Sequence, residues 1–172
     1  IKYLCFDNFL VWSNYFKKKL FEVNRNYISK RIFISGFSKK KISKNIDKSK
    51  INILFIIDLD LDFQITKNFL KNLNKVKRVN LYVKLKPQVA ENIWEKLCIK
   101  EKIKFFKFEN LDEINQSIKM DYFIGNISTA IIEAPLYGAI PLKIISKNDF
   151  ADDLIRDKVV IKIKNFNDIV KI

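Results

Sequence analysis

The sequence of 172 residues contains no histidine, only three glycines and three prolines, and two cysteines. The absence of histidine excludes Ser-His and Cys-His catalysis, and most transition-metal sites, from this stretch of chain. The scarcity of glycine and proline argues against long disordered linkers. Cys5 and Cys98 are far apart in sequence and form no metal-binding pair. We therefore expect two reduced thiols.

Long apolar runs are missing as well. None approaches the roughly 18 residues of a membrane-spanning helix, and the basic, aromatic start Ile1-Lys2-Tyr3 lacks the layout of a signal peptide. Hydrophobic residues nevertheless make up 48% of the chain, enough for the core of one domain. The sequence predicts a soluble, cytoplasmic domain. Because it begins with isoleucine, we expect it to be a piece of a longer protein.

The formal net charge is +14, and the isoelectric point is near 9.7. Three interpretations stay open: generic surface charge, partly reflecting genomic base composition; attraction to an anionic membrane surface or substrate; and, ranked last, nucleic-acid binding. The segment 38–50 is polar, basic and aperiodic, which predicts a linker or loop. The lysines of this region that would serve a basic binding module are Lys39, Lys40, Lys41, Lys44, Lys48 and Lys50.

Strand and helix patterns alternate along the chain. Strands are predicted at 9–12, 31–36, 51–57, 79–87, 102–108, 122–124, 139–145 and 159–163, with helices near 13–24, 65–73, 88–98, 111–118, 128–134, 152–157 and 168–172. The β-branched run 51–57 is typical of the central strand of a parallel sheet. This alternation predicts an α/β fold, a doubly wound, Rossmann-like parallel sheet with right-handed crossovers.

Three acids follow the run 51–57, namely Asp58, Asp60 and Asp62. They suggest a metal site, but the glycine and terminal glutamate of an EF-hand loop are absent. Solvated acids, or a cap for the next helix, are the favoured interpretation. We predict no metal.

The segment 121–134 is the feature around which the chain is organised. It predicts a buried strand, a tight loop at Gly125 and Asn126, and a helix starting at Ser128 or Thr129. Two interpretations stand for the two hydroxyls. They cap the helix, or they also bind phosphate where a strand feeds a helix at the ligand-binding edge of an α/β sheet. Pro135 is expected to kink or shorten this helix.

Four features carry a resemblance to a known family. They are Leu10-Val11-Trp12-Ser13 followed by a helix and Ile34-Ser35-Gly36-Phe37, then Lys84-Leu85-Lys86-Pro87, then Ser128-Thr129-Ala130-Ile131-Ile132-Glu133-Ala134, and Gly138-Ala139-Ile140-Pro141. In this order they resemble the C-terminal, nucleotide-sugar-binding half of GT-B-fold glycosyltransferases. The similarity is to the bacterial surface-polysaccharide type, including sialyltransferase-like, polysialyltransferase-like and CDP-glycerol transferase-like groups.

The resemblance implies one half of a two-domain GT-B enzyme: residues 1–37 as a crossover from a missing N-terminal domain, 38–50 as the basic linker, and 51–172 as the donor domain. It implies a CMP-, CDP- or UDP-activated sugar as co-substrate, a glycan or lipid-linked acceptor, and no metal or other cofactor. The general base is expected in the missing domain, so this piece is expected to be inactive alone. Peripheral attachment to the inner face of the cell membrane is a further expectation.

The nucleotide and phosphate site implied by the resemblance consists of Gly125, Asn126, Ser128, Thr129, Glu133, Lys86 and Pro87. Lys86 departs from the family pattern, which has histidine at its position, and offers phosphate a point charge instead of an imidazole. Glu133 either binds ribose or sugar hydroxyls or simply favours the helix N-terminus. Two alternatives to this function stay open, a sugar-nucleotide epimerase of the same fold and a basic module for nucleic acid or membrane surfaces.

Overall fold

The computed structural model describes residues 9–23, 32–36, 49–58, 61–86, 91–126, 128–144, 152–163 and 168–169. The chain forms two compact units, Ile1–Lys39 and Lys40–Ile172. Most of the predicted linker 38–50 lies outside the described residues. Its proposed role, and the roles given to the segments on either side, stay predictions.

The first unit is a strand, a helix and a strand. Strand β1 (Phe9–Val11) pairs in parallel with β2 (Ile32–Ile34), and α1 (Asn14–Val23) lies between them in the chain. Within the unit, the rings of Trp12 and Phe16 pack edge to face with centroids 5.5 Å apart. The helix and strand predicted for this segment are confirmed.

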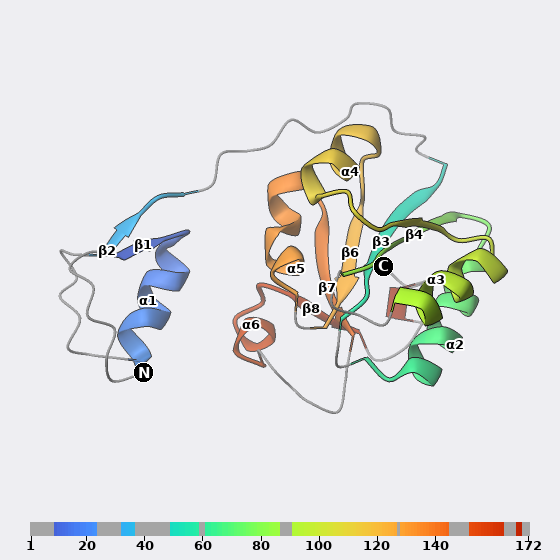
Figure 1. The fold of residues 1–172 in the computed structure, drawn as a ribbon. Coiled ribbons are helices and arrows are strands. Elements are labelled where there is room, and N and C mark those ends of the chain that lie inside the picture. The colour runs from blue at the N-terminus through green and yellow to red at the C-terminus, as the bar shows by residue number, and fades with distance from the viewer. Residues whose placement is uncertain are drawn as a thin grey trace. The chain divides into compact units, whose positions relative to one another are not determined.

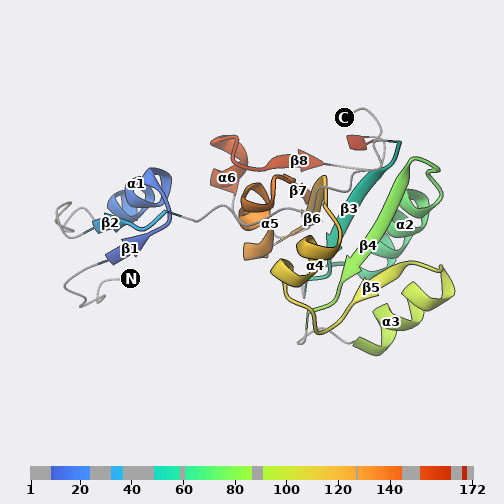
Figure 2. The ribbon, with the colours of Figure 1, turned by 90° about the horizontal axis from the view of Figure 1, so that it is seen from above.

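The second unit is built on a six-stranded parallel sheet (Figures 1 and 2). Its strands are β3 (Ile51–Ile56), β4 (Val79–Lys84), β5 (Lys104–Phe106), β6 (Tyr122–Gly125), β7 (Ile140–Ile144) and β8 (Ile161–Ile163). Its helices are α2 (Phe63–Asn74), α3 (Glu91–Lys100), α4 (Leu111–Ser117), α5 (Thr129–Glu133), the 3₁₀ turn η2 (Ala134–Tyr137) and α6 (Asp152–Arg156). The predicted α/β fold with a parallel sheet is confirmed.

The sheet separates two hydrophobic cores, because successive side chains of a strand point to opposite faces. In β3 and the residue after it, Ile53, Phe55 and Ile57 pack with α2 and α3, whereas Leu54 and Ile56 pack with α4 and α5. All five side chains are buried. Figure 1 shows α2 and α3 on one side of the sheet and α4, α5 and α6 on the other. Burial on both faces explains why β3 is an unbroken apolar run.

The strand order is β5-β4-β3-β6-β7-β8. From β3 the chain moves outward through β4 to β5, then returns past β3 to β6 and continues to β7 and β8. The connecting helices change face where this direction reverses, which keeps one hand of crossover throughout. The sheet therefore reverses its winding between β3 and β6.

The helix after β6 is short, as Pro135 predicted. α5 ends at Glu133, and the chain tightens into η2 with Pro135 in its first turn, because proline has no N–H to continue an α-helix. Gly138 then ends η2 in the left-handed region, at φ 71°, where glycine is favoured over residues with a Cβ.

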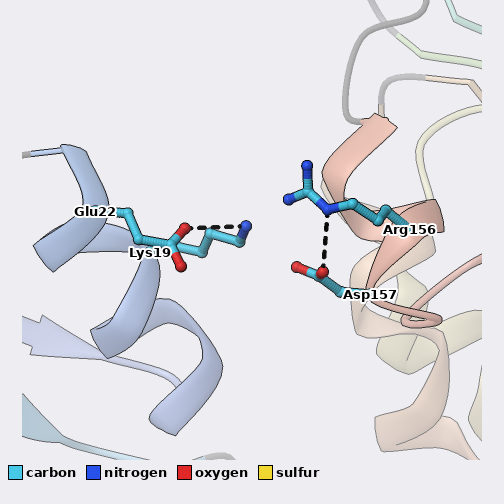
Figure 3. A network of polar contacts seen from close by, with 4 residues as sticks. All are labelled: Lys19, Glu22, Arg156 and Asp157. Carbon is cyan, nitrogen blue, oxygen red and sulfur yellow. Dashed lines mark hydrogen bonds and ion pairs between the residues drawn. The ribbon is translucent and has the colours of Figure 1, made fainter.

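Two surface ion pairs lie one in each unit (Figure 3). Lys19 and Glu22 pair at 3.2 Å within α1, and Arg156 pairs with Asp157 at 3.4 Å at the end of α6. Exposed pairs of this kind contribute little stability. In the described part of the chain, no helix is long and apolar enough to cross a membrane.

Candidate functional site

The candidate site lies at the carboxyl edge of the sheet, where its winding reverses. In open α/β sheets, ligands bind outside the carboxyl ends of the two strands that flank the reversal, because the loops that follow these strands turn in opposite directions. Here the two strands are β3 and β6. Asp58 follows β3, and Asn126 follows β6.

Asp58 joins the loops of three strands. Its carboxylate accepts a hydrogen bond from the backbone N–H of Asn126, with 3.0 Å between nitrogen and Oδ2. Its Oδ1 forms an ion pair of 2.5 Å with Nζ of Lys86, which follows β4. Asp58 is 3% exposed and the Lys86 side chain 33%. A charge buried this deeply requires such partners.

Gly125 is required by this arrangement. A Cβ on Gly125 would lie 2.9 Å from Cδ1 of Ile131 and 3.3 Å from Oδ2 of Asp58. The absence of a side chain therefore lets α5 and the Asp58 carboxylate approach the end of β6.

The side chain of Asn126 makes no hydrogen bond to any described residue. The residue is 3% exposed, and neither Oδ1 nor Nδ2 of its carboxamide has a partner among the described residues. Buried amides are almost always hydrogen-bonded, since an unpaired one costs roughly 1–3 kcal/mol. This one sits at the ligand-binding edge of the fold, where a bound molecule would supply the missing partners.

Ser128 and Thr129 begin α5 with different exposure. Ser128 is 6% exposed, and its Oγ accepts a long bond of 3.4 Å from the N–H of Ala130, so the predicted cap is confirmed. Thr129 is exposed. With only five residues, α5 contributes a small dipole at this point. Whether the two hydroxyls also bind phosphate stays a prediction.

Glu133 lies at the end of α5, half-buried and near Tyr137. The Tyr137 hydroxyl donates to Oδ1 of Asp112 in α4 at 2.8 Å. Burial raises the pKa of Tyr137 well above its ordinary value, and the carboxylates of Asp112 and Glu133 raise it further. This contact joins η2 to α4 on the same face of the sheet.

The side chain of Lys84, at the carboxyl end of β4, forms hydrogen bonds with backbone carbonyl groups. Its Nζ donates to the carbonyl oxygens of Leu85 and Lys107, each at 3.0 Å. Burial lowers the pKa of Lys84, against the opposing effect of Glu109 and Glu113. Lys84 therefore ties the β4 and β5 loops together, while Lys86 is the cation that reaches Asp58.

The structure brings together three of the predicted site residues, Lys86, Gly125 and Asn126, around Asp58. Pro87 lies outside the described residues. From the sequence, Asp58 is assigned to an acidic run and is not included in the site. Its position directly after the central strand of the sheet could have identified it as a site residue. Asp62 of the same run caps α2 by accepting from the N–H of Ile65 at 2.9 Å. Among the described residues, no group of three acidic, cysteine or histidine side chains is arranged to hold a metal ion.

Comparison with known proteins bears on the fold. No family model and no curated protein matches the sequence. A crystal structure of TarM matches with a TM-score of 0.52 and 13% identity, over 96% of this chain and 35% of that one. The apo form of the lipopolysaccharide outer core galactosyltransferase WaaB matches with a TM-score of 0.45 and 12% identity, over 86% of this chain and 45% of that one.

The chain spans less than half the length of either structure. At this level of identity, the match to TarM shows a similar fold and nothing more. The chain has a parallel, Rossmann-like α/β fold that is consistent with one domain of the GT-B architecture.

Proposed function

We propose that this chain is the donor-binding domain of a glycosyltransferase, and that it holds a nucleotide-activated sugar at the carboxyl edge between β3 and β6. The fold supports the proposal, since the TarM structure with which it is shared is that of a glycosyltransferase. The place supports it too, because nucleotides bind α/β sheets where the winding reverses.

The observation that carries the proposal is the carboxamide of Asn126. It is buried, has no hydrogen-bond partner among the described residues and follows the strand that flanks the reversal. A carboxamide offers two donors and an acceptor with two lone pairs. This set suits the hydroxyl groups of a ribose or sugar ring, or the edge of a base.

Phosphate binding falls to the neighbouring groups in this proposal. Thr129 is exposed, and Ser128 lies beside it at the start of α5. Lys86 reaches phosphate by exchanging Asp58 for the ligand, as a point charge. Glu133 accepts hydroxyl groups of the ribose or sugar. These groups would stabilise the charge that develops on the leaving phosphate, without a metal ion.

The wider role is also a proposal. The donor is a CMP-, CDP- or UDP-activated sugar, the acceptor is a glycan or a lipid-linked glycan, and the product is a bacterial surface glycan such as capsule or lipooligosaccharide. The general base comes from a second domain. The piece of chain described here therefore binds donor but transfers no sugar alone.

The test is a thermal-unfolding titration of the chain with CMP, CDP, UMP, UDP and GDP. One nucleotide class should raise the melting temperature saturably, through preferential binding to the folded state. Asn126→Leu should weaken that binding by about tenfold or more, because hydrogen bonds to the ligand are lost. Without ligand, this variant should be at least as stable as the parent, since leucine fills a similar volume and the carboxamide has no hydrogen bond to a described residue to lose.

Two comparisons complete the experiment. Ser128→Ala/Thr129→Ala should weaken the binding of the nucleotide phosphates and leave the nucleoside response. Asn115→Ala serves as the control, because Asn115 is also a buried asparagine but lies in α4 and donates to the carbonyl of Leu111. A folded parent chain that responds to none of the nucleotides would overturn the proposal.

A further inference from the structure

Basic residues of the second unit gather at the amino edge of the sheet, opposite the candidate site. They lie just before β3, between α2 and β4, and between α3 and β5, and we call this group the basic amino edge. Its six members are all exposed: Lys50, Lys75, Lys77, Arg78, Lys100 and Lys102.

Contacts between the loops make the basic amino edge one continuous surface. The N–H of Ile51 donates to the carbonyl of Arg78 at 2.7 Å, which places Lys50 beside the α2–β4 loop. Nδ2 of Asn74 donates to the carbonyl of Glu101 at 2.8 Å, which joins the end of α2 to the α3–β5 loop. The three loops belong to the neighbouring strands β3, β4 and β5.

The acids near this edge are engaged by other groups. Glu101 pairs with Lys71 at 3.0 Å, and Asp121 accepts from the N–H of Asn52 at 2.8 Å. None of the six cations forms an ion pair with a described residue, whereas Lys86 and Lys107 at the opposite edge both do. The opposite edge also holds Asp58 and Asp62, and the acids Glu109, Asp112 and Glu113 around the start of α4.

Local stability explains part of this distribution. Lys75 and Lys100 lie at the C-terminal ends of α2 and α3, where a positive charge favours the helix dipole. It does not explain Lys50, Lys77, Arg78 and Lys102, which lie outside the helices. In the sequence, Lys48 stands two residues before Lys50 and extends the same bias.

We propose that the basic amino edge docks the protein on an anionic phospholipid surface. Five of its six members are lysines, which meet phosphate-bearing headgroups as mobile point charges. Ile99, in the last turn of α3 and beside Lys100, is 64% exposed and supplies an apolar side chain to the interface. The loops 75–78 and 100–103 contain no aromatic residue on which a base of nucleic acid would stack.

The charge difference between the two edges sets the orientation. The acids of the carboxyl edge turn away from an anionic surface, so the candidate site faces the aqueous phase, from which a soluble ligand arrives. This inference does not depend on the proposed function, because it concerns the opposite edge of the sheet.

The experiment measures sedimentation of the whole chain with phosphatidylcholine vesicles, with and without phosphatidylglycerol, at low and high salt. We expect binding only with phosphatidylglycerol and its loss at high salt. Arg78→Glu/Lys102→Glu should weaken binding at least about 25-fold, from roughly fivefold per basic residue. Lys18→Glu/Lys96→Glu makes the same change in net charge at exposed positions outside the edge, and should retain most of the binding.

Three results would overturn the inference. The first is no binding to phosphatidylglycerol vesicles by the folded parent chain. The second is equal weakening by the two charge-reversed variants, which would mean that only net charge matters. The third is tighter binding to an oligonucleotide than to the vesicles, lost in the edge variant but unchanged in Ile99→Ser, which would make the edge a nucleic-acid surface. Nucleotide titration of Arg78→Glu/Lys102→Glu tests the two proposals separately. Loss of vesicle binding concerns the basic amino edge, whereas loss of the nucleotide response concerns the proposed function.

Discussion

At the scale of single residues, Asp58 governs the charge of the candidate site. Its carboxylate is buried at the edge of the sheet where we propose that the nucleotide binds, and it forms an ion pair with the ammonium group of Lys86. A phosphate-bearing ligand must therefore compete with Asp58 for Lys86. The residue keeps this cation in place and also weakens its attraction for other anions.

Replacing Asp58 with asparagine should release Lys86 and remove the repelling charge, while the amide oxygen still accepts from the N–H of Asn126. If the ligand is a nucleoside diphosphate, its affinity should rise by about tenfold, the size expected for one hydrogen bond to a charged group. Isothermal titration of Asp58→Asn and Asp58→Asn/Lys86→Met measures this, and the double variant should lose the gain. A weaker affinity in Asp58→Asn would mean that the carboxylate itself binds the ligand.

Gly125→Ala should destabilise the fold by about 1–3 kcal/mol, because the new Cβ overlaps Cδ1 of Ile131 and presses on Asp58. Urea unfolding measures the change. Ile131→Val removes the overlapping methyl group, so the double variant should be more stable than the sum of the two single effects predicts. Strict additivity would show that the cost does not arise from this contact.

At the scale of elements, the helices and strands were predictable where a local pattern decides them. The apolar run of β3, the helical spacing of α2 and the effect of Pro135 on α5 all follow from residues near one another in sequence. The predicted ends differ by a few residues. Of the helix expected over 88–98, residues 88–90 lie outside the described part of the chain, and α3 continues two residues beyond the predicted end, to Lys100.

At the scale of elements, the capping box of α4 is the feature whose removal is most clearly expected to lower the free energy of unfolding. The Asn110 side chain accepts from the N–H of Glu113 at 2.9 Å, and the Glu113 side chain accepts from the N–H of Asn110 at 2.8 Å. Asn110→Ala should lower the free energy of unfolding by about 1 kcal/mol, and Asn110→Ser should keep most of it. Chemical denaturation of the two variants makes the comparison, and equal stability would contradict the cap's contribution.

At the scale of the whole molecule, the candidate site could be predicted only in part. Gly125, Asn126 and Ser128 lie close together in the sequence, and they predict a loop at the edge of the sheet. Asp58 meets Asn126 from 68 positions away in the chain. That meeting depends on β3 pairing with β6, and no local pattern specifies which strand becomes the neighbour of the central one.

Stability at alkaline pH is also a property of the whole molecule. Burial raises the pKa of Cys98 from 9.0 to about 11, with a further contribution from Glu95, and it raises the pKa values of Tyr82, Tyr122 and Tyr137. The protonated forms are thus favoured by folding. Their contribution is complete below the unfolded-state value of 9.0 for the thiol and is lost as the pH rises through about 11.

The free energy of unfolding should therefore fall between pH 9 and about 11. The lowered pKa of Lys84 opposes this trend, as one group against four. Urea denaturation across this range measures the slope, and Cys98→Ala should reduce it near its lower end. A slope that is unchanged in Cys98→Ala would mean that the buried thiol does not titrate with folding.

The order of the strands predicts how ligand binding would change amide hydrogen exchange in this domain. In the described sheet, two consecutive stretches of sequence, β3 to β5 and β6 to β8, meet where β3 pairs with β6. The pairing runs from Ile53 with Tyr122 to Phe55 with Ile124. A molecule bound across this line holds the two stretches together, so the exchange of amide protons with deuterated solvent should slow in both central strands at once.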